Sequence, residues 1–228
     1  MIQILPLADI IHEEVLLEDD FNNSFEGWEQ VDRDEEKAFI KDSHYWMENK
    51  SATRWMFYPK KLPVTSSENF IINAEIELLG LDRGYRKYGL VWGFDQHHEV
   101  LNKFVVSIEH DQFSISKFQK DHAFEKHRFS GNYENHDRQS GRQFFSIVKL
   151  DNYYYFFLNK HDRPVYMTHV SQMPMDGDRF GFYVEPGIMM RCDKITVKRL
   201  ITNKNFTGHP WMPITDDLMP MGSVILRG

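Results

Sequence analysis

Apolar and polar residues alternate in short runs along most of the chain from residue 37 to residue 200. Alternation with a period of two places successive side chains on opposite faces of a strand, so that one face packs and the other meets solvent or a ligand. Asp, Asn and Gly separate the runs at positions typical of tight turns. The pattern predicts strands at residues 37–42, 53–59, 68–80, 87–94, 103–110, 112–118, 142–150, 153–159, 164–170, 178–184 and 193–200.

Many short strands at this spacing are typical of an all-β protein, and we expect a two-sheet antiparallel β-sandwich of the jelly-roll kind. A chain of 228 residues is long enough to bury a substantial core within a single domain of this class. We place that domain at residues 19–200.

The two ends of the chain differ from this middle part. Residues 1–18 are assigned to an N-terminal extension, in which residues 8–17 show a weak helical periodicity. Residues 201–228 form a C-terminal tail that is rich in Pro and Met and lacks alternation over most of its length. Trp211 and Met212 indicate that this tail packs on the domain or on a partner, because a free tail rarely carries such apolar side chains.

Composition and charge exclude several classes of function. The net charge is −7, from 34 acidic and 27 basic residues, and no basic stripe is present, so we expect no nucleic-acid partner. Pro6, Asp9 and His12 interrupt the apolar residues near the start, which predicts neither a signal peptide nor a membrane span. We therefore expect a cytoplasmic protein, and a secreted one only if a leader has been removed. The single cysteine, Cys192, lies in a predicted strand and is expected to be a buried core residue.

Three segments carry a resemblance to a known superfamily: DDFNNSFEGW (19–28), YGLVWGF (88–94) and RFGFYVEPGIMMRCDKITV (179–197). In this order they resemble the concanavalin A-like lectin/glucanase superfamily, and within it the bacterial laminin-G-like and 3-keto-disaccharide-hydrolase-like domains. The resemblance covers residues 19–200 and implies a jelly-roll sandwich with a concave sheet. It concerns the pattern of the fold and carries no signature of a catalytic site.

The catalytic strand of glycosidases in this superfamily resembles the pattern Glu-x-Asp-x-(x)-Glu, in which carboxylates share one face. Glu75 and Glu77 share a face of their predicted strand, but no aspartate lies between them. They are the candidates for catalysis, although alternating carboxylates are also common on solvent-facing sides of strands. A glycoside hydrolase with an unrecognised carboxylate pair is therefore an alternative function.

The resemblance also implies a structural calcium ion between the chain start and the final strand, where carboxylate oxygens converge in some relatives. Asp20 and Asp193 match these places. The alternative is that Asp20 caps a turn and Asp193 begins a strand. No other cofactor is expected.

The strand at residues 87–94 contains two glycines, which weaken a strand unless something approaches its backbone closely. Alternation places Trp92 with the apolar set that faces the core. Gly89 and Gly93 then line the concave face, where a ligand would touch the backbone.

A carbohydrate site also needs aromatic rings for the apolar face of a sugar and polar groups for its hydroxyls. Tyr153 and Tyr155 alternate along one strand and are candidates for a solvated binding face. Trp55, Tyr85 and Arg191 complete the candidate set.

The sequence therefore predicts a non-catalytic, lectin-like module that binds a glycan on its concave sheet. Besides the hydrolase, a third hypothesis is a protein-interaction domain, in which the aromatic face and the tail join a protein partner or a second copy.

Overall fold

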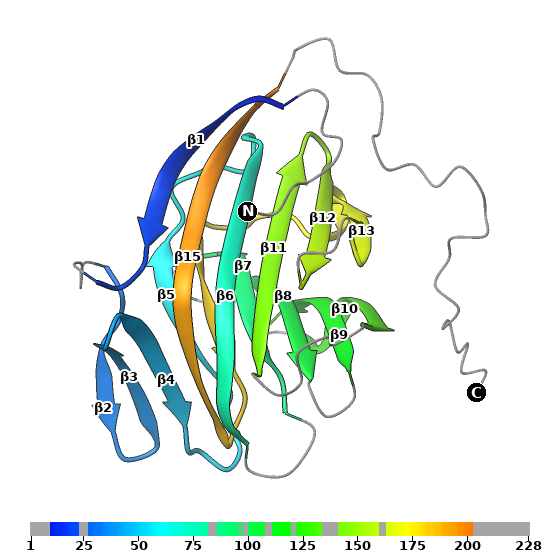
Figure 1. The fold of residues 1–228 in the computed structure, drawn as a ribbon. Coiled ribbons are helices and arrows are strands. Elements are labelled where there is room, and N and C mark those ends of the chain that lie inside the picture. The colour runs from blue at the N-terminus through cyan, green and yellow to red at the C-terminus, as the bar shows by residue number, and fades with distance from the viewer. Residues whose placement is uncertain are drawn as a thin grey trace, which may run out of the picture.

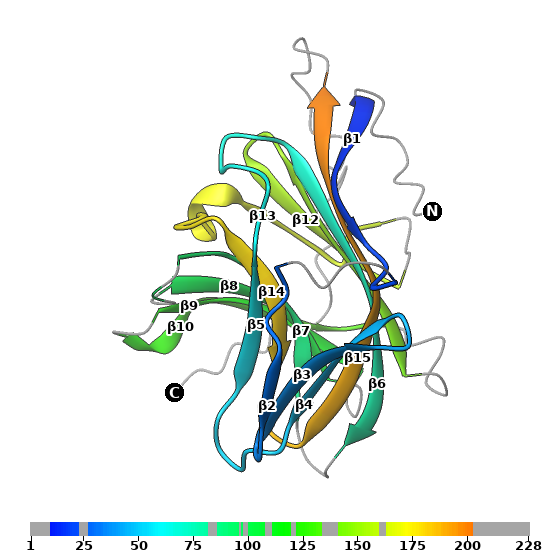
Figure 2. The same ribbon diagram turned by 90° about the vertical axis from the view of Figure 1, so that its left-hand side faces the viewer.

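The computed structural model describes residues 10–22, 27–81, 86–95, 97, 100–107, 111–119, 122–133, 141–159 and 163–202. These residues form two antiparallel sheets that pack face to face, with the larger sheet in front of the smaller one in Figure 1 and the two layers seen from the side in Figure 2. The prediction of an all-β sandwich is confirmed. Among the described residues, no helix has the length and apolar character needed to span a membrane.

The larger sheet has nine strands. Its order is β13 (Tyr166–His169), β12 (Tyr153–Leu158), β11 (Arg142–Leu150), β6 (Phe70–Leu81), β15 (Ile188–Thr202), β4 (His44–Asn49), β3 (Glu36–Lys41) and β2 (Val31–Arg33), with β1 (Ile10–Asp19) paired to β15. The smaller sheet has the order β10 (His122–Asn132), β9 (Gln112–Gln119), β8 (Val100–Ser107), β7 (Tyr88–Phe94), β14 (Arg179–Val184) and β5 (Met56–Lys61). Within the described residues, a 3-10 turn, η2 (Val170–Gln172), follows β13.

The helical periodicity of residues 8–17 was a wrong indication, because residues 10–19 form strand β1 along β15. Cross-strand pairing satisfies the backbone of β1, and ion pairs of Glu13 with Lys198 (2.7 Å) and Glu14 with Arg199 (2.6 Å) add to it. Residues 10–18, which the sequence assigned to an extension, are thus part of the larger sheet. Of the predicted tail, residues 203–228 lie outside the described part.

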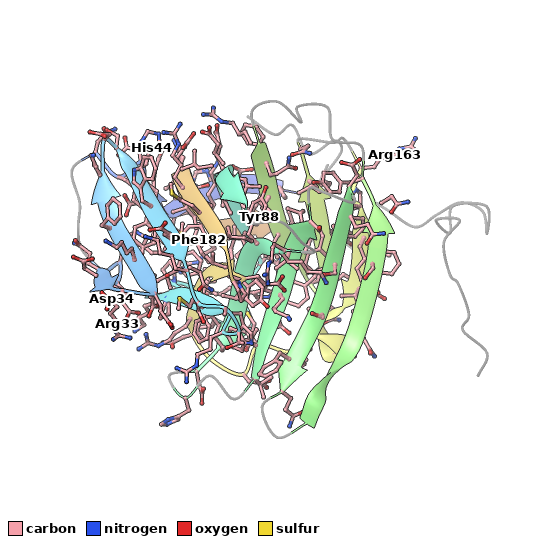
Figure 3. The ribbon with its side chains drawn as sticks, turned by 90° about the horizontal axis from the view of Figure 1, so that it is seen from below. Arg33, Asp34, His44, Tyr88, Arg163 and Phe182 are labelled. Carbon is pink, nitrogen blue, oxygen red and sulfur yellow. The ribbon has the colours of Figure 1, made fainter. Side chains whose placement is uncertain are left out.

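Aromatic side chains fill the space between the sheets. Trp92 is fully buried, and its ring lies 5.8 Å from that of Tyr154 and 5.6 Å from that of Phe156 on the opposite sheet. Figure 3 shows Tyr88 and Phe182 near the middle of the molecule. The predictions that Trp92 and Cys192 are core residues are confirmed, and burial raises the pKa of the Cys192 thiol well above its usual value.

The Asp-Asp-Phe…Trp segment connects the two sheets near the start of the domain. Asp19 is buried, and its carboxylate accepts hydrogen bonds from Trp28 Nε1 (2.7 Å) and from the Phe21 amide (2.9 Å). Lys60 Nζ from β5 lies 3.4 Å from the same carboxylate and 4.8 Å from the centre of the Trp28 ring. The segment therefore joins the two sheets through a buried ion pair.

Candidate functional site

The outer side of the smaller sheet carries a group of aromatic and charged side chains, which we call the aromatic face: Trp55, Phe57, Lys103, Phe118, Tyr183 and Glu185. The Trp55 ring lies 5.4 Å from Phe57, 5.6 Å from Tyr183 and 5.6 Å from Phe118. Trp55, Phe57 and Phe118 are partly exposed. Beneath them, Val91, Leu101 and Val105 are buried, so the rings stand on an apolar floor.

Alternation along two strands produces this arrangement. In β14, Phe180 and Phe182 point into the core, which leaves Tyr183 on the outer side. In β8, Phe104 points into the core and Lys103 lies on the outer side, opposite Ser116 of β9. The Ser116 Oγ is buried and has no hydrogen-bond partner among the protein atoms.

The charged groups of the aromatic face lie close to Tyr183. The Lys103 Nζ sits 5.1 Å from the centre of the Tyr183 ring, a cation–π distance. The Glu185 carboxylate accepts hydrogen bonds from the Lys87 amide (2.8 Å) and the Tyr183 hydroxyl (3.3 Å). Burial raises the pKa of Glu185, and this effect outweighs the hydrogen bonds and the charges of Lys87 and Lys103 that lower it.

These groups offer two kinds of contact to a ligand. The rings of Trp55 and its neighbours suit the apolar face of a sugar, while a carboxyl group, an ammonium group and a hydroxyl suit sugar hydroxyls. A carboxyl group with a raised pKa is able to donate as well as accept a hydrogen bond in mildly acidic solution.

The structure divides the predicted ligand-binding residues between two opposite faces. Trp55 belongs to the aromatic face. Gly89 and Gly93 lie in β7 of the same sheet, whereas Tyr153, Tyr155 and Arg191 lie in strands of the larger sheet. Tyr85 falls outside the described residues.

The two glycines of β7 are needed because other protein atoms lie close to their backbone. A Cβ atom on Gly89 would lie 2.3 Å from the carbonyl oxygen of Phe104 in β8. A Cβ atom on Gly93 would lie 2.9 Å from Met175 Cγ, and the φ of Gly93 is +71°. The expectation that the glycines present their backbone to a ligand is therefore replaced by close packing of neighbouring protein segments.

Tyr155 is buried, with 2% of its surface exposed, and burial raises its pKa to about 12. It packs against Val148 and Phe157 on the outer side of the larger sheet. Tyr153 is partly buried, and its ring lies 5.2 Å from that of His169. The two tyrosines therefore belong to a packed apolar group and do not form the solvated face that alternation indicated.

Arg191 and Glu77 belong to a row of side chains that crosses five strands of the larger sheet: Phe39, Trp46, Arg191, Glu77 and Arg142. The Phe39 and Trp46 rings are stacked at 6.2 Å, and the Arg191 guanidinium lies 5.6 Å from the Trp46 ring. Arg191 donates to Glu77 Oε2 at 2.7 and 3.1 Å.

The other charged residues of this face join the same network. Arg142 lies 2.8 Å from Glu75, 3.5 Å from Glu77 and 2.8 Å from Asp193. His44 Nε2 lies 3.2 Å from Asp193. The carboxylates of Glu75 and Glu77, the weak catalytic candidates, thus face guanidinium groups, which is the arrangement of a structural ion-pair network.

The two predicted calcium ligands have different surroundings. The Asp20 carboxylate is exposed and accepts hydrogen bonds from the backbone amide (3.1 Å) and side chain (2.8 Å) of Asn22, which lower its pKa. Asp193 forms an ion pair with Arg142 and lies beside His44, as described above. In the described part of the chain, no group of three or more His, Cys, Asp or Glu residues is gathered for a metal ion. The calcium site stays a prediction.

Comparison with known proteins places the architecture. No family model and no curated protein sequence matches the chain. The solved structures that resemble it include a carbohydrate-binding module, CBM66, from Bacillus subtilis (TM-score 0.52, 15% identity, covering 75% of this chain and 95% of that one). They also include an endo-β-1,3-glucanase from Pyrococcus furiosus (0.58, 10%, 84% and 96%) and a protein of unknown function with a galectin-like fold from Bacillus subtilis (0.59, 9%, 83% and 98%). The chain has the concanavalin A-like jelly-roll fold.

Within this concanavalin A-like jelly roll, sequence reasoning missed three residues of the aromatic face: Lys103, Tyr183 and Glu185. A signal for them was present. Lys103 interrupts an apolar run immediately before Phe104, and Tyr183 and Glu185 continue the outward phase of a strand whose inward phase is entirely apolar. What the pattern lacked was the pairing that brings these strands together.

Proposed function

We propose that the protein is a non-catalytic, lectin-like module that binds a glycan on the aromatic face. The observation that carries this proposal is the partly exposed Trp55 ring, which is packed beside Tyr183 with Lys103 and Glu185 next to it. Proteins bind sugars with aromatic rings, which contact the apolar face of the sugar, and with a few polar groups, which bond to its hydroxyls.

One further observation supports binding over hydrolysis. A double displacement uses two carboxyl groups about 5 Å apart. Strands β5, β7, β8, β9 and β14 contain no aspartate or glutamate, and Glu185 directly follows β14. The similar structures include a carbohydrate-binding module and an endo-β-1,3-glucanase, so they support a carbohydrate-related function and do not choose between binding and hydrolysis.

The proposal predicts selective binding in a glycan-array screen of the purified chain, with calcium present, followed by calorimetry on any positive glycan. The Trp55→Ala variant should weaken binding at least tenfold, because a central aromatic contact contributes about 2 kcal/mol or more. The matched control is Trp46→Ala, which removes a partly exposed tryptophan from the opposite sheet and should leave affinity unchanged. Equal losses in both variants, or no binding across the array, would overturn the proposal.

A glycoside hydrolase is the second candidate, and the raised pKa of Glu185 favours it, because a general acid needs such a shift. Release of reducing ends from a bound glycan, abolished in Glu185→Gln but retained in Glu77→Gln, would assign the chain to this class. Binding without product release in the same samples supports the lectin-like module.

A further inference from the structure

Five strands of the smaller sheet differ in charge from the chain as a whole. The chain carries a net charge of −7. Strands β5, β7, β8, β9 and β14 contain no aspartate or glutamate, and their basic residues are Lys60, Lys61, Lys103, Lys117 and Arg179. Lys60 lies 3.4 Å from Asp19, and Lys117 lies 2.9 Å from Asp176. The other three lie on the outer side of the sheet, together with the aromatic face.

Two of these cations, Lys61 of β5 and Arg179 of β14, form what we call the basic pair. They lie directly opposite each other in the register of the two strands. Tyr58 and Phe180 point into the core, so alternation places both cationic side chains on the outer side. Like charges that lie directly opposite each other on neighbouring strands destabilise a sheet. The basic pair is therefore suited to an anion that lies between the two side chains.

Protein carboxylates neutralise the basic pair only weakly. Asp178 Oδ2 lies 3.8 Å from Lys61 Nζ, and these side chains are 61% and 80% exposed. Solvent screens an ion pair that is exposed to this extent. Arg179 is partly exposed, and within the described part of the chain no carboxylate lies at ion-pair distance from its guanidinium. Both cations are thus accessible to a ligand.

The basic pair is continuous with the aromatic face. Arg179 lies opposite Phe94 of β7, and the Phe94 ring lies 5.5 Å from that of Phe57. Tyr183 lies four residues beyond Arg179 on the same side of β14, which is about 13 Å at the rise of a strand. This distance is longer than one sugar ring, so a glycan that contacts both residues is an oligosaccharide or a longer chain.

We propose that the glycan bound on the aromatic face is acidic, and that Arg179 and Lys61 bind its carboxylate or sulfate groups. This inference rests on the proposed function, because the rings of the aromatic face bind the apolar faces of the same sugars. A guanidinium presents a planar fork of donors that matches the oxygen atoms of such anions. Lys103, 5.1 Å from the centre of the Tyr183 ring, adds positive potential on the same side of the sheet.

Glu185 is the acidic member of the aromatic face. Its carboxyl group accepts hydrogen bonds from the Lys87 amide and the Tyr183 hydroxyl, and burial raises its pKa. A proton on this group removes its repulsion of an acidic ligand in mildly acidic solution.

Polysaccharides that differ chiefly in charge test the proposal, with calorimetry on the full chain. One pair is polygalacturonate and its methyl ester, which reports on carboxylates, and the other is dextran sulfate and dextran, which reports on sulfates. The acidic member of at least one pair should bind at least about tenfold more tightly than its neutral partner. Its affinity should fall as sodium chloride is added, because salt screens exposed charges.

The Arg179→Gln variant should weaken binding of the acidic glycan about tenfold, as expected for the loss of a charge-assisted hydrogen bond. Arg179→Lys should restore part of that loss. Lys61→Gln, at a highly exposed side chain, should weaken binding about threefold and serves as the second variant if Arg179→Gln disturbs folding. The control is Arg163→Gln, which removes an exposed cation just before β13 of the larger sheet and should leave affinity unchanged.

The possible failures of this inference and of the proposed function are distinct. Binding to neutral glycans alone, still lost in Trp55→Ala, would overturn the acidic ligand and leave the lectin-like module standing. No binding to any glycan would overturn both. Polyglutamate that binds as tightly as the acidic glycan would make the attraction one of charge alone. That result, or equal losses in Arg179→Gln and Arg163→Gln, would also overturn the inference.

Discussion

At the scale of single residues, two neighbouring aspartates show how far environment outweighs identity. Asp19 is buried and holds Trp28 and Lys60, whereas Asp20 is exposed and bonds only to Asn22 in the described surroundings. Removing a buried carboxylate leaves its hydrogen-bond donors and its counter-ion without a partner.

The Asp19→Ala variant should therefore lose about 2–4 kcal/mol of unfolding free energy, and Asp20→Ala should lose little. Urea unfolding of both variants checks this. The same series in calcium and in chelator tests the predicted ion, because calcium bound at Asp20 would stabilise the native chain but not Asp20→Ala. Equal destabilisation by the two substitutions would contradict the account of Asp19.

At the scale of elements, strand β7 depends on its two glycines, because neighbouring protein segments approach its backbone closely. It pairs with β8 on one side and β14 on the other, and the register shifts beside Gly93 where Phe94 pairs with Arg179. Such a bulge bends a strand, and a glycine at positive φ accommodates it. The glycines are thus requirements of strand pairing.

Gly89→Ala should destabilise the sandwich by about 2 kcal/mol or more, because its new methyl group would meet the Phe104 carbonyl at 2.3 Å. The matched control is Gly80→Ala in β6, where the nearest atom would be Met189 Cβ at 3.9 Å, an ordinary contact. Thermal unfolding should show a lower midpoint for the first variant and an equal or slightly higher one for the second. A tolerated Gly89→Ala would mean that β8 moves away freely.

At the scale of the whole molecule, the sandwich presents two faces of different character. The aromatic face offers rings beside Lys103 and Glu185, whereas the larger sheet carries the ion-pair network and the packed apolar group of Tyr155, Val148 and Phe157. Phe129 of β10 and Tyr166 of β13 stack at 4.0 Å and join the edge strands of the two sheets.

The stability of the whole molecule should depend on pH through Glu185. Its folded-state pKa is raised, chiefly by burial, so between the ordinary and the raised value the native state binds the proton that the unfolded state has lost. Stability therefore falls as pH rises through this window. Glu185→Gln should remove that part of the dependence, so its advantage over the native chain should grow through the window and then stay constant. Urea unfolding across a pH series measures this, and a difference that does not vary with pH would contradict it.

Much of the fold was predictable because alternation is a local property. The runs containing Ile72, Trp92 and Phe182 gave the strands and their inward faces, and the structure has them there. Strands β1, β2, β4 and β10 were missed. Residues 10–19 and 122–132 have little alternation and become strands by pairing with β15 and β9. Of the candidate site, the sequence found Trp55 but grouped it with Tyr155 and Arg191, which lie in the other sheet.

The sequence by itself determined that this protein is a β-sandwich, because the period of its side chains specifies strands with one buried face. It also determined which glycines and aromatic residues were unusual. Only the tertiary structure decided which outer face each of these residues occupies, because pairing and register depend on contacts between segments far apart in the chain. That decision separates Lys103, Tyr183 and Glu185, which surround the candidate site, from Glu75, Glu77 and Arg191, which join Arg142 in the ion-pair network on the opposite side.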